Sequence, residues 1–383
     1  MTVLSKNVPF VDLTIQHQPL QADIEKAIET VVKRGDFVLG QALREFETEF
    51  AHASGVNYGV GVASGTDAIA LGLQACGINE GDEVIVPANT FIATVIGVIK
   101  SGATPILVDC DPETALIDLN AAAKAITPKT KAIVPVHLYG QMVSPSQLLD
   151  FAQAYNLIIF EDAAQAHLAE REGYTAGSIG KAAAFSFYPS KNLGAFGNGG
   201  MLITSDEEVA QNVRTLRNYG APSKYYHTQI GINSRLDTLQ AAILQVKLPH
   251  LAQWNKLRNQ AAKNYDQGLQ SLADKGIVPI QNLSDRGHVY HLYVIRIHDT
   301  CTLNRENLQD DLLKRGIQTG IHYPIPCHLQ PGYKGLGYQL GDFPHSETLC
   351  NEILSLPMYP GISSEHTNWV IEQLSLLISK RNY

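Results

Sequence analysis

Apolar residues recur at helical spacing in the first part of the chain. The pattern predicts a helix over residues 19–34 that stops at Gly35. Its apolar positions are Leu20, Ile24, Ala27, Ile28 and Val31. A second helix is expected to follow and to end at Gly55, and its apolar face is formed by Leu43, Phe46 and Phe50.

From there to about residue 205, short apolar runs alternate with helical stretches. The candidate strands are EVIVP, TPILVD, KAIVPVHL, LIIFED, AAFSF and GGMLIT. Such alternation predicts an α/β fold, with a mostly parallel sheet that has helices on both faces.

A further apolar stripe predicts a helix over residues 236–248, which Pro249 closes. The length of 383 residues exceeds the size at which a single core stops growing. We therefore expect a large domain over 1–249 and a smaller C-terminal α/β domain over 250–383. The N-terminal segment of the large domain can pack on the small domain.

Composition narrows the class of protein. Hydrophobic residues make up 45% and charged residues 17%, which is typical of a globular chain. The net charge of -8 argues against nucleic-acid binding, which needs a basic surface. The chain has no apolar run long enough for a bilayer, its start (MTVLSKNVPFVDL) lacks a signal core, and no metal-binding cluster occurs. We expect a cytoplasmic protein without a membrane or metal partner.

Polar residues follow three candidate strands at their carboxyl ends, where open parallel sheets bind ligands. The strand GVGVA leads into Ser-Gly-Thr at 64–66, LIIFED ends on Asp162, and AAFSF is followed by YPSK, with Ser186 and Lys191. The turn 64–66 opens a helix whose first amides lack partners, so it suits a phosphate. It is also an ordinary helix N-cap.

Asp162 and Lys191 each allow two interpretations. Asp162 either caps the turn that follows it or holds a cation such as a protonated pyridinium nitrogen. Lys191 is either a surface lysine in a glycine-rich loop or a buried amine that attacks a carbonyl. Taken together, the three clusters describe a phosphate cup, a pyridinium partner and a Schiff-base lysine.

The chain also resembles a known family, the DegT/DnrJ/EryC1/StrS sugar aminotransferases. The resemblance covers nearly the whole length and is carried by GDEVIVPANTFIAT, VPVHLYGQ, IFEDAAQAH, AAAFSFYPSKNLGAFGNGG, GINSRLDTLQAAIL and GIHYPIPCHLQP. It implies the aspartate-aminotransferase type of fold and the cofactor pyridoxal 5'-phosphate (PLP). The chain departs from similar sequences at Asn198 and Lys181, where acidic residues are common.

The resemblance implies a role for each matching residue. Lys191 would bind PLP as a Schiff base and move a proton, and Asp162 would pair with the ring nitrogen. Gln165 would contact the phenolic oxygen, while Ser186 and the Gly65-Thr66 turn would hold the phosphate.

Further roles concern the ring, the partner chain and the substrate. Phe91 would stack on the cofactor ring, although a core aromatic is an alternative. Asn233 would reach the phosphate in the neighbouring subunit of a homodimer, or would simply cap its own helix. Candidates for contacts with the substrate are Tyr188, His322 and Tyr323, and also His137.

The implied reaction moves an amino group from L-glutamate to a keto group of a nucleotide-linked sugar. The stretches HLYVIR and TGIHYPIPCHLQPGY resemble enzymes that aminate dTDP-3-oxo-6-deoxyhexoses. A UDP-linked or 4-keto sugar is the alternative within this class. A PLP-dependent sugar dehydratase, in which histidine replaces the lysine, and a non-catalytic PLP-binding regulator are alternatives outside it.

Overall fold

The computed structural model describes residues 6–379, so the first five residues of the N-terminal stretch inspected for a signal sequence lie outside the described residues. A seven-stranded sheet has the order β1-β9-β8-β5-β4-β2-β3. Its strands are β1 (Tyr58–Val62), β2 (Glu83–Pro87), β3 (Thr104–Val108), β4 (Thr130–Ile133), β5 (Ile158–Asp162), β8 (Ala182–Ser186) and β9 (Gly200–Thr204). Only β9 runs antiparallel to its neighbours in this sheet. The predicted, mostly parallel sheet is confirmed.

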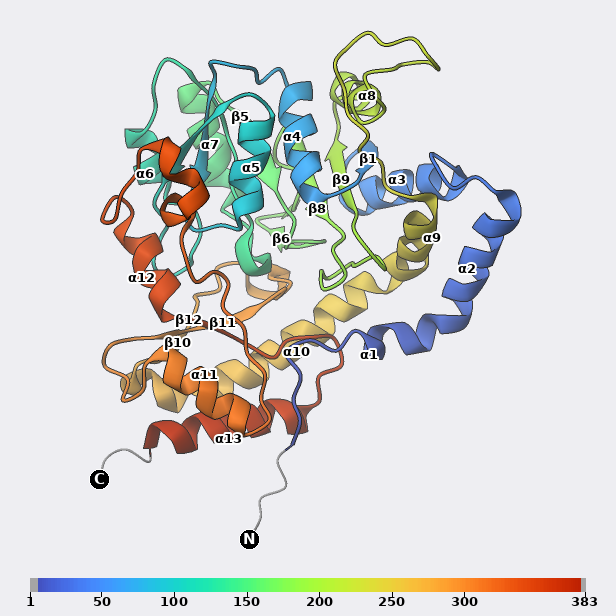
Figure 1. The fold of residues 1–383 in the computed structure, drawn as a ribbon. Coiled ribbons are helices and arrows are strands. Elements are labelled where there is room, and N and C mark those ends of the chain that lie inside the picture. Colours follow the sequence, from blue (N-terminus) through green and yellow to red (C-terminus); the bar gives the residue numbers. More distant parts are fainter. Residues whose placement is uncertain (1–5, 380–383) are drawn as a thin grey trace.

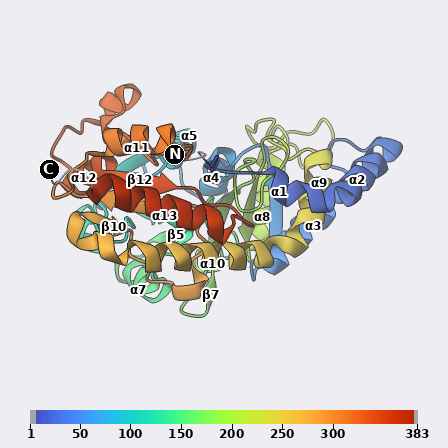
Figure 2. The same cartoon turned by 90° about the horizontal axis from the view of Figure 1, so that it is seen from below.

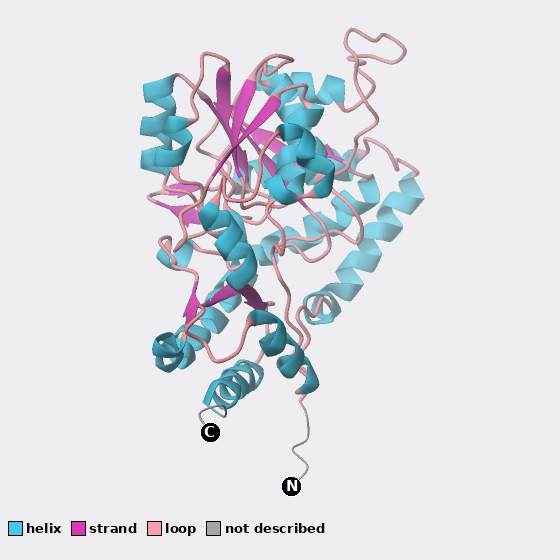
Figure 3. Cartoon of the chain, turned by 60° about the vertical axis from the view of Figure 1, so that its left-hand side comes forward, coloured by secondary structure: helices cyan, strands magenta, loops and turns pink. Residues whose placement is uncertain are grey.

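Two helical layers cover this sheet because successive strand residues face opposite sides. On β2, Val84 and Val86 join one apolar cluster, whereas Ile85 joins another. The first cluster packs under α4 (Gly65–Ala75), α5 (Ile92–Lys100) and α8 (Glu207–Leu216). The second packs under α3 (Gln41–Ala53), α6 (Leu119–Lys124), α7 (Pro145–Tyr155) and α9 (Thr238–Lys247). Figure 3 shows the strands between these helices.

The helices predicted near the N-terminus form where the apolar pattern places them. After the short α1 (Thr14–His17), helix α2 (Gln21–Arg34) ends at Gly35, whose φ of 70° suits a glycine. Helix α2 packs against α9, and its far end projects beyond the rest of the molecule (Figures 1 and 2).

A second, antiparallel sheet has the order β10-β11-β12. Its strands are β10 (Ile277–Pro279), β11 (Tyr293–Ile297) and β12 (Ile353–Leu356). It shares an apolar cluster with α10 (Leu251–Leu269), α11 (Arg305–Lys314) and α13 (Ser364–Ser379), and α10 lies beside α13 in Figure 2. Val8 joins this cluster and pairs with Ile317, so the N-terminal segment packs here.

The remaining elements are α12 (Pro344–Glu352) and the hairpin of β6 (Glu170–Arg171) and β7 (Tyr174–Thr175). No helix within residues 6–379 is long and apolar enough to cross a membrane.

Candidate active site

A cavity of about 370 Å³ lies beyond the carboxyl ends of β1, β5 and β8. All the predicted site residues except Asn233 and His137 line it. They are Gly65, Thr66, Phe91, Asp162, Gln165, Ser186, Tyr188, Lys191, His322 and Tyr323. Residues from the large sheet region and from the C-terminal part of the chain therefore meet in one site.

The turn at 64–66 is both an N-cap and an anion cradle. Ser64 Oγ accepts the Asp67 N–H at 3.1 Å, as a capping residue does. The N–H groups of Gly65 and Thr66 donate to no other described residue. A Cβ at Gly65 would lie 2.9 Å from Ser186 Cβ, so only glycine lets these two segments approach this closely. Free amides at a helix start fit a phosphate group.

Asp162 is 5% exposed and ends β5 at the cavity wall. Its carboxylate accepts hydrogen bonds from Thr94 Oγ1 at 2.7 Å and from the Ala164 N–H at 3.1 Å. Burial raises the pKa of Asp162, while these two hydrogen bonds and the nearby Lys191 act in the opposite sense. A cation bound at this wall would stabilise the charged carboxylate, and a protonated pyridine ring is such a cation.

Lys191 lines the same cavity, and its Nζ makes no hydrogen bond to a described residue. Burial lowers the pKa of Lys191 to about 8, although the charge of Asp162 raises it in part. A lowered pKa leaves more of the amine neutral, which is the form that attacks the aldehyde of PLP.

Three further side chains complete the wall. Gln165 Oε1 accepts the Tyr139 N–H at 2.7 Å, and Gln165 Nε2 donates to Tyr323 Oη at 3.1 Å. The second hydrogen of this amide remains for a ligand oxygen. The Phe91 ring lies 5.2 Å from the Tyr323 ring and is 51% exposed, so Phe91 is not a core aromatic.

The histidines separate into two groups. His322 lines the cavity and its Nδ1 lies 2.9 Å from Ser355 Oγ, while burial lowers its pKa to about 4. His137 is fully buried outside the cavity lining, 2.9 Å from Glu161, so the hypothesis that it touches substrate is wrong. His291 lines the cavity and was not singled out, because only its place in the HLYVIR stretch marked it.

Asn233 lies outside the cavity of its own chain and is exposed. It follows the loop 219–232, which extends from the body of the molecule between α8 and α9 (Figure 1).

The fold and site define a PLP-dependent aminotransferase of the aspartate-aminotransferase fold type. The groups that line the cavity fit PLP: free amides for the phosphate, a buried carboxylate for the ring nitrogen and an amine for the aldehyde.

Comparisons with known proteins give the family. The model of the DegT/DnrJ/EryC1/StrS aminotransferase family matches residues 18–375. A dTDP-3-amino-3,4,6-trideoxy-alpha-D-glucose transaminase from Streptomyces venezuelae is 43% identical, over 95% of this chain and 94% of its own. A dTDP-3-amino-3,6-dideoxy-alpha-D-galactopyranose transaminase from Aneurinibacillus thermoaerophilus is also 43% identical, over 96% and 99%.

A solved structure of S. venezuelae DesV, in complex with a ketimine intermediate, is 42% identical. It covers 98% of this chain and 99% of its own, with a TM-score of 0.93. The chain belongs to the DegT/DnrJ/EryC1/StrS aminotransferase family.

Proposed function

We propose that this aminotransferase takes an amino group from L-glutamate and places it on C3 of a dTDP-3-oxo-6-deoxyhexose, giving a 3-amino-3,6-dideoxyhexose. The unpaired amine of Lys191 in the same cavity as the buried Asp162 is the observation that carries the proposal. The two 43% identical transaminases, both named for 3-amino deoxyhexoses, support the choice of sugar.

PLP, when bound, supplies an electron sink for the reaction. Asp162 holds a positive charge at the cavity wall, and Gly65, Thr66 and Ser186 bind the phosphate. Lys191 Nζ takes up and returns a proton, which its lowered pKa makes easier near neutral pH. Gln165 would donate its free amide hydrogen to an oxygen of the cofactor, and Phe91 would pack on the cofactor ring.

Tyr188, His322 and Tyr323 are proposed to contact the sugar. Tyr188 is 56% exposed at the cavity, and Tyr323 lies between Gln165 and Phe91. Because its pKa is about 4, His322 is neutral at pH 7, so it offers a hydrogen bond rather than a charge.

We propose that the enzyme is a homodimer whose active sites include Asn233 from the partner. Apolar side chains are strongly exposed on the loop 219–232 and near the end of α2. They are Ile230 (98%), Tyr225 (84%), Tyr226 (64%), Val32 (56%) and Val38 (56%). A second copy would bury these side chains and bring Asn233 to a phosphate that its own chain does not place beside it.

Product analysis tests the reaction. Purified holoenzyme is mixed with L-glutamate and a panel of dTDP- and UDP-linked 3-keto and 4-keto sugars. We expect 2-oxoglutarate and amino sugar to form in equal amounts with the dTDP-3-keto sugar, and Lys191→Ala to form neither. A preference for a UDP-linked or 4-keto sugar would show that the proposed substrate is wrong. A dehydrated sugar formed without 2-oxoglutarate would show that the reaction is a dehydration and not an amino transfer.

A further inference from the structure

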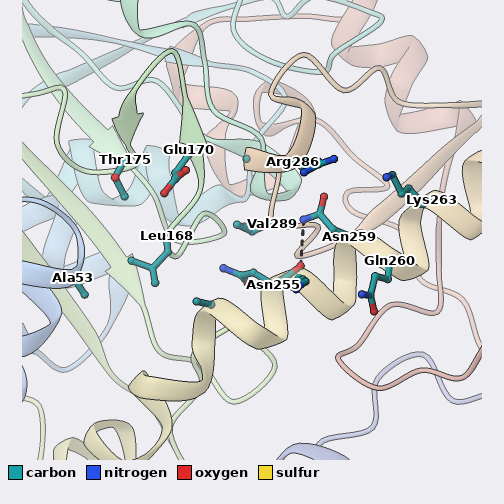
Figure 4. Close-up of a pocket in the computed structure, with 13 residues that line it drawn as sticks. Ala53, Leu168, Glu170, Thr175, Asn255, Asn259, Gln260, Lys263, Arg286 and Val289 are labelled. Atoms are coloured by element: carbon teal, nitrogen blue, oxygen red, sulfur yellow. Dashed lines mark hydrogen bonds between the residues drawn. The ribbon is translucent and has the colours of Figure 1, made fainter.

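A second cavity, of about 440 Å³, lies away from the proposed active site. Its lining comes from α10, the β6–β7 hairpin and the turn at 286–289 (Figure 4). None of the residues assigned to PLP or the sugar lines it. The proposed reaction therefore leaves this cavity without a role.

The lining of this cavity is cationic. Lys256, Lys263 and Arg286 line it, and Glu170 is the single acidic residue among the lining residues. Within residues 6–379, none of the three cations makes an ion pair or a side-chain hydrogen bond. In Figure 4 the charged ends of Lys263 and Arg286 point toward one another. Two like charges that converge without an acid between them favour an anion there.

Polar groups surround this pair of cations. Asn255, Asn259 and Gln260 of α10 line the cavity, and Figure 4 shows Glu170 and Thr175 on the hairpin side, opposite α10. The Asn255 amide is already hydrogen-bonded within the chain, and Asn259 Nδ2 donates to two carbonyl oxygens. The side-chain oxygens of Asn259 and Gln260, with the hydroxyl and carboxylate of the hairpin side, can still accept hydrogen bonds from the hydroxyl and N–H groups of a sugar or a base. The volume lies within the usual range for sites that bind small molecules.

A hydrogen-bonded wall separates the two cavities. Asn255 is 7% exposed, accepts a hydrogen bond from Asn192 Nδ2 at 2.9 Å, and donates one to the His167 carbonyl at 2.9 Å. Asn192 follows Lys191, and His167 Nε2 lies 3.0 Å from the carbonyl oxygen of Ser186. A ligand in the second cavity therefore contacts the rear of this wall and does not occupy the space of PLP or the sugar.

We propose that this cavity binds a phosphate-bearing ligand of about the size of a nucleoside diphosphate. Arg286 and Lys263 hold the phosphate groups, since a guanidinium donates two parallel hydrogen bonds to phosphate oxygens and an ammonium adds a point charge. Lys256 supplies further positive charge, and the polar groups on the hairpin side bind the remainder of the ligand. This site is separate from the proposed reaction and does not depend on it.

Calorimetric titration of the holoenzyme with dTDP tests the proposal. We expect wild type to bind one more equivalent of dTDP per chain than the double variant Lys263→Ala/Arg286→Ala. Lys263→Ala alone should weaken this additional site about tenfold, because it removes a charge-assisted contact. Lys124→Ala, an exposed lysine on α6, is the matched control and should titrate as wild type.

Inorganic pyrophosphate distinguishes recognition of phosphate from recognition of the rest of the nucleotide. It should displace dTDP from the additional site in wild type. Equal stoichiometry in wild type and the double variant would overturn the proposal, as would an additional site that pyrophosphate cannot compete for. Amino transfer to the sugar is measured separately in the same proteins, so the two proposals fail independently.

Discussion

Lys191 should titrate well below the ordinary lysine value of 10.5 in the cofactor-free protein. Its pKa is lowered to about 8 by burial. At pH 7.5 such an amine is about one quarter neutral, whereas a lysine with a pKa of 10.5 is about 0.1% neutral. Only the neutral amine reacts with an electrophile. At pH 7.5, Lys191 should therefore react over 100-fold faster than an equally accessible amine of the same intrinsic reactivity whose pKa is 10.5.

Competitive labelling measures this pKa directly. Cofactor-free enzyme is treated with limiting acetic anhydride between pH 6 and pH 11, and the acetylated peptides are quantified by mass spectrometry. The labelling of Lys191 should rise with pH, reach half of its plateau near pH 8, and level off well below the ordinary lysine value of 10.5. A Lys191 midpoint near the ordinary lysine value of 10.5 would refute the reasoning, because burial would then not control the amine.

The direction in which the pKa of Lys191 moves in the variant Asp162→Asn tests the influence of Asp162. The charge of Asp162 raises the pKa of Lys191 and so opposes the effect of burial. Replacing Asp162 by the neutral, isosteric asparagine removes that attraction, so the midpoint for Lys191 should move further down. An unchanged midpoint would mean that Asp162 is not charged in the cofactor-free site or does not act on this amine.

Further measurements on variants test the cofactor cradle and the dimer. Gly200→Ala puts a Cβ 2.6 Å from the Gly65 nitrogen and should weaken PLP binding about tenfold in equilibrium dialysis, whereas Gly332→Ala, with open space around it, should not. Asp162→Asn should reduce the turnover rate more than the PLP content. Wild-type turnover in this variant would show that Asp162 does not hold the charged ring nitrogen. Lys191→Ala and Asn233→Asp homodimers should each be nearly inactive. Refolded together, they should regain about one quarter of wild-type activity, because both changes fall on the same site of a heterodimer and leave the other site intact. Heterodimers that form but stay inactive would show that each site is built from one chain.

The elements that the sequence predicted well are those with a local signal. The strands EVIVP and LIIFED are continuous apolar runs because β2 and β5 are covered on both faces, and this is typical of a parallel sheet. The stop of α2 at Gly35 also has a local cause, the positive φ of that residue. Such features need only neighbouring residues to be recognised.

Contacts between distant segments carried no such signal. His291 and His322 reach the cavity from around β11 and from the segment before β12, more than 90 residues beyond Lys191. The periodicity of their own segments says nothing about this approach. His137 shows the converse, since a motif placed it near the site while its ring packs against Glu161 inside the fold.

The adjacent acids of β5 show how strand geometry divides structural from chemical roles. Successive residues on a strand face opposite sides, so Glu161 and Asp162 point apart. Glu161 is fully buried, and its carboxylate accepts hydrogen bonds from the N–H groups of Ile179 and Gly180 at 2.9 and 2.8 Å, with His137 at 2.9 Å. Its hydrogen-bonding capacity is met within the chain. Among residues 6–379, the Asp162 carboxylate accepts hydrogen bonds from Thr94 and Ala164 alone, so its buried charge still favours a cation in the cavity. A shift of one residue in β5 would exchange the two acids, and the register of the strand therefore determines which carboxylate faces the cofactor.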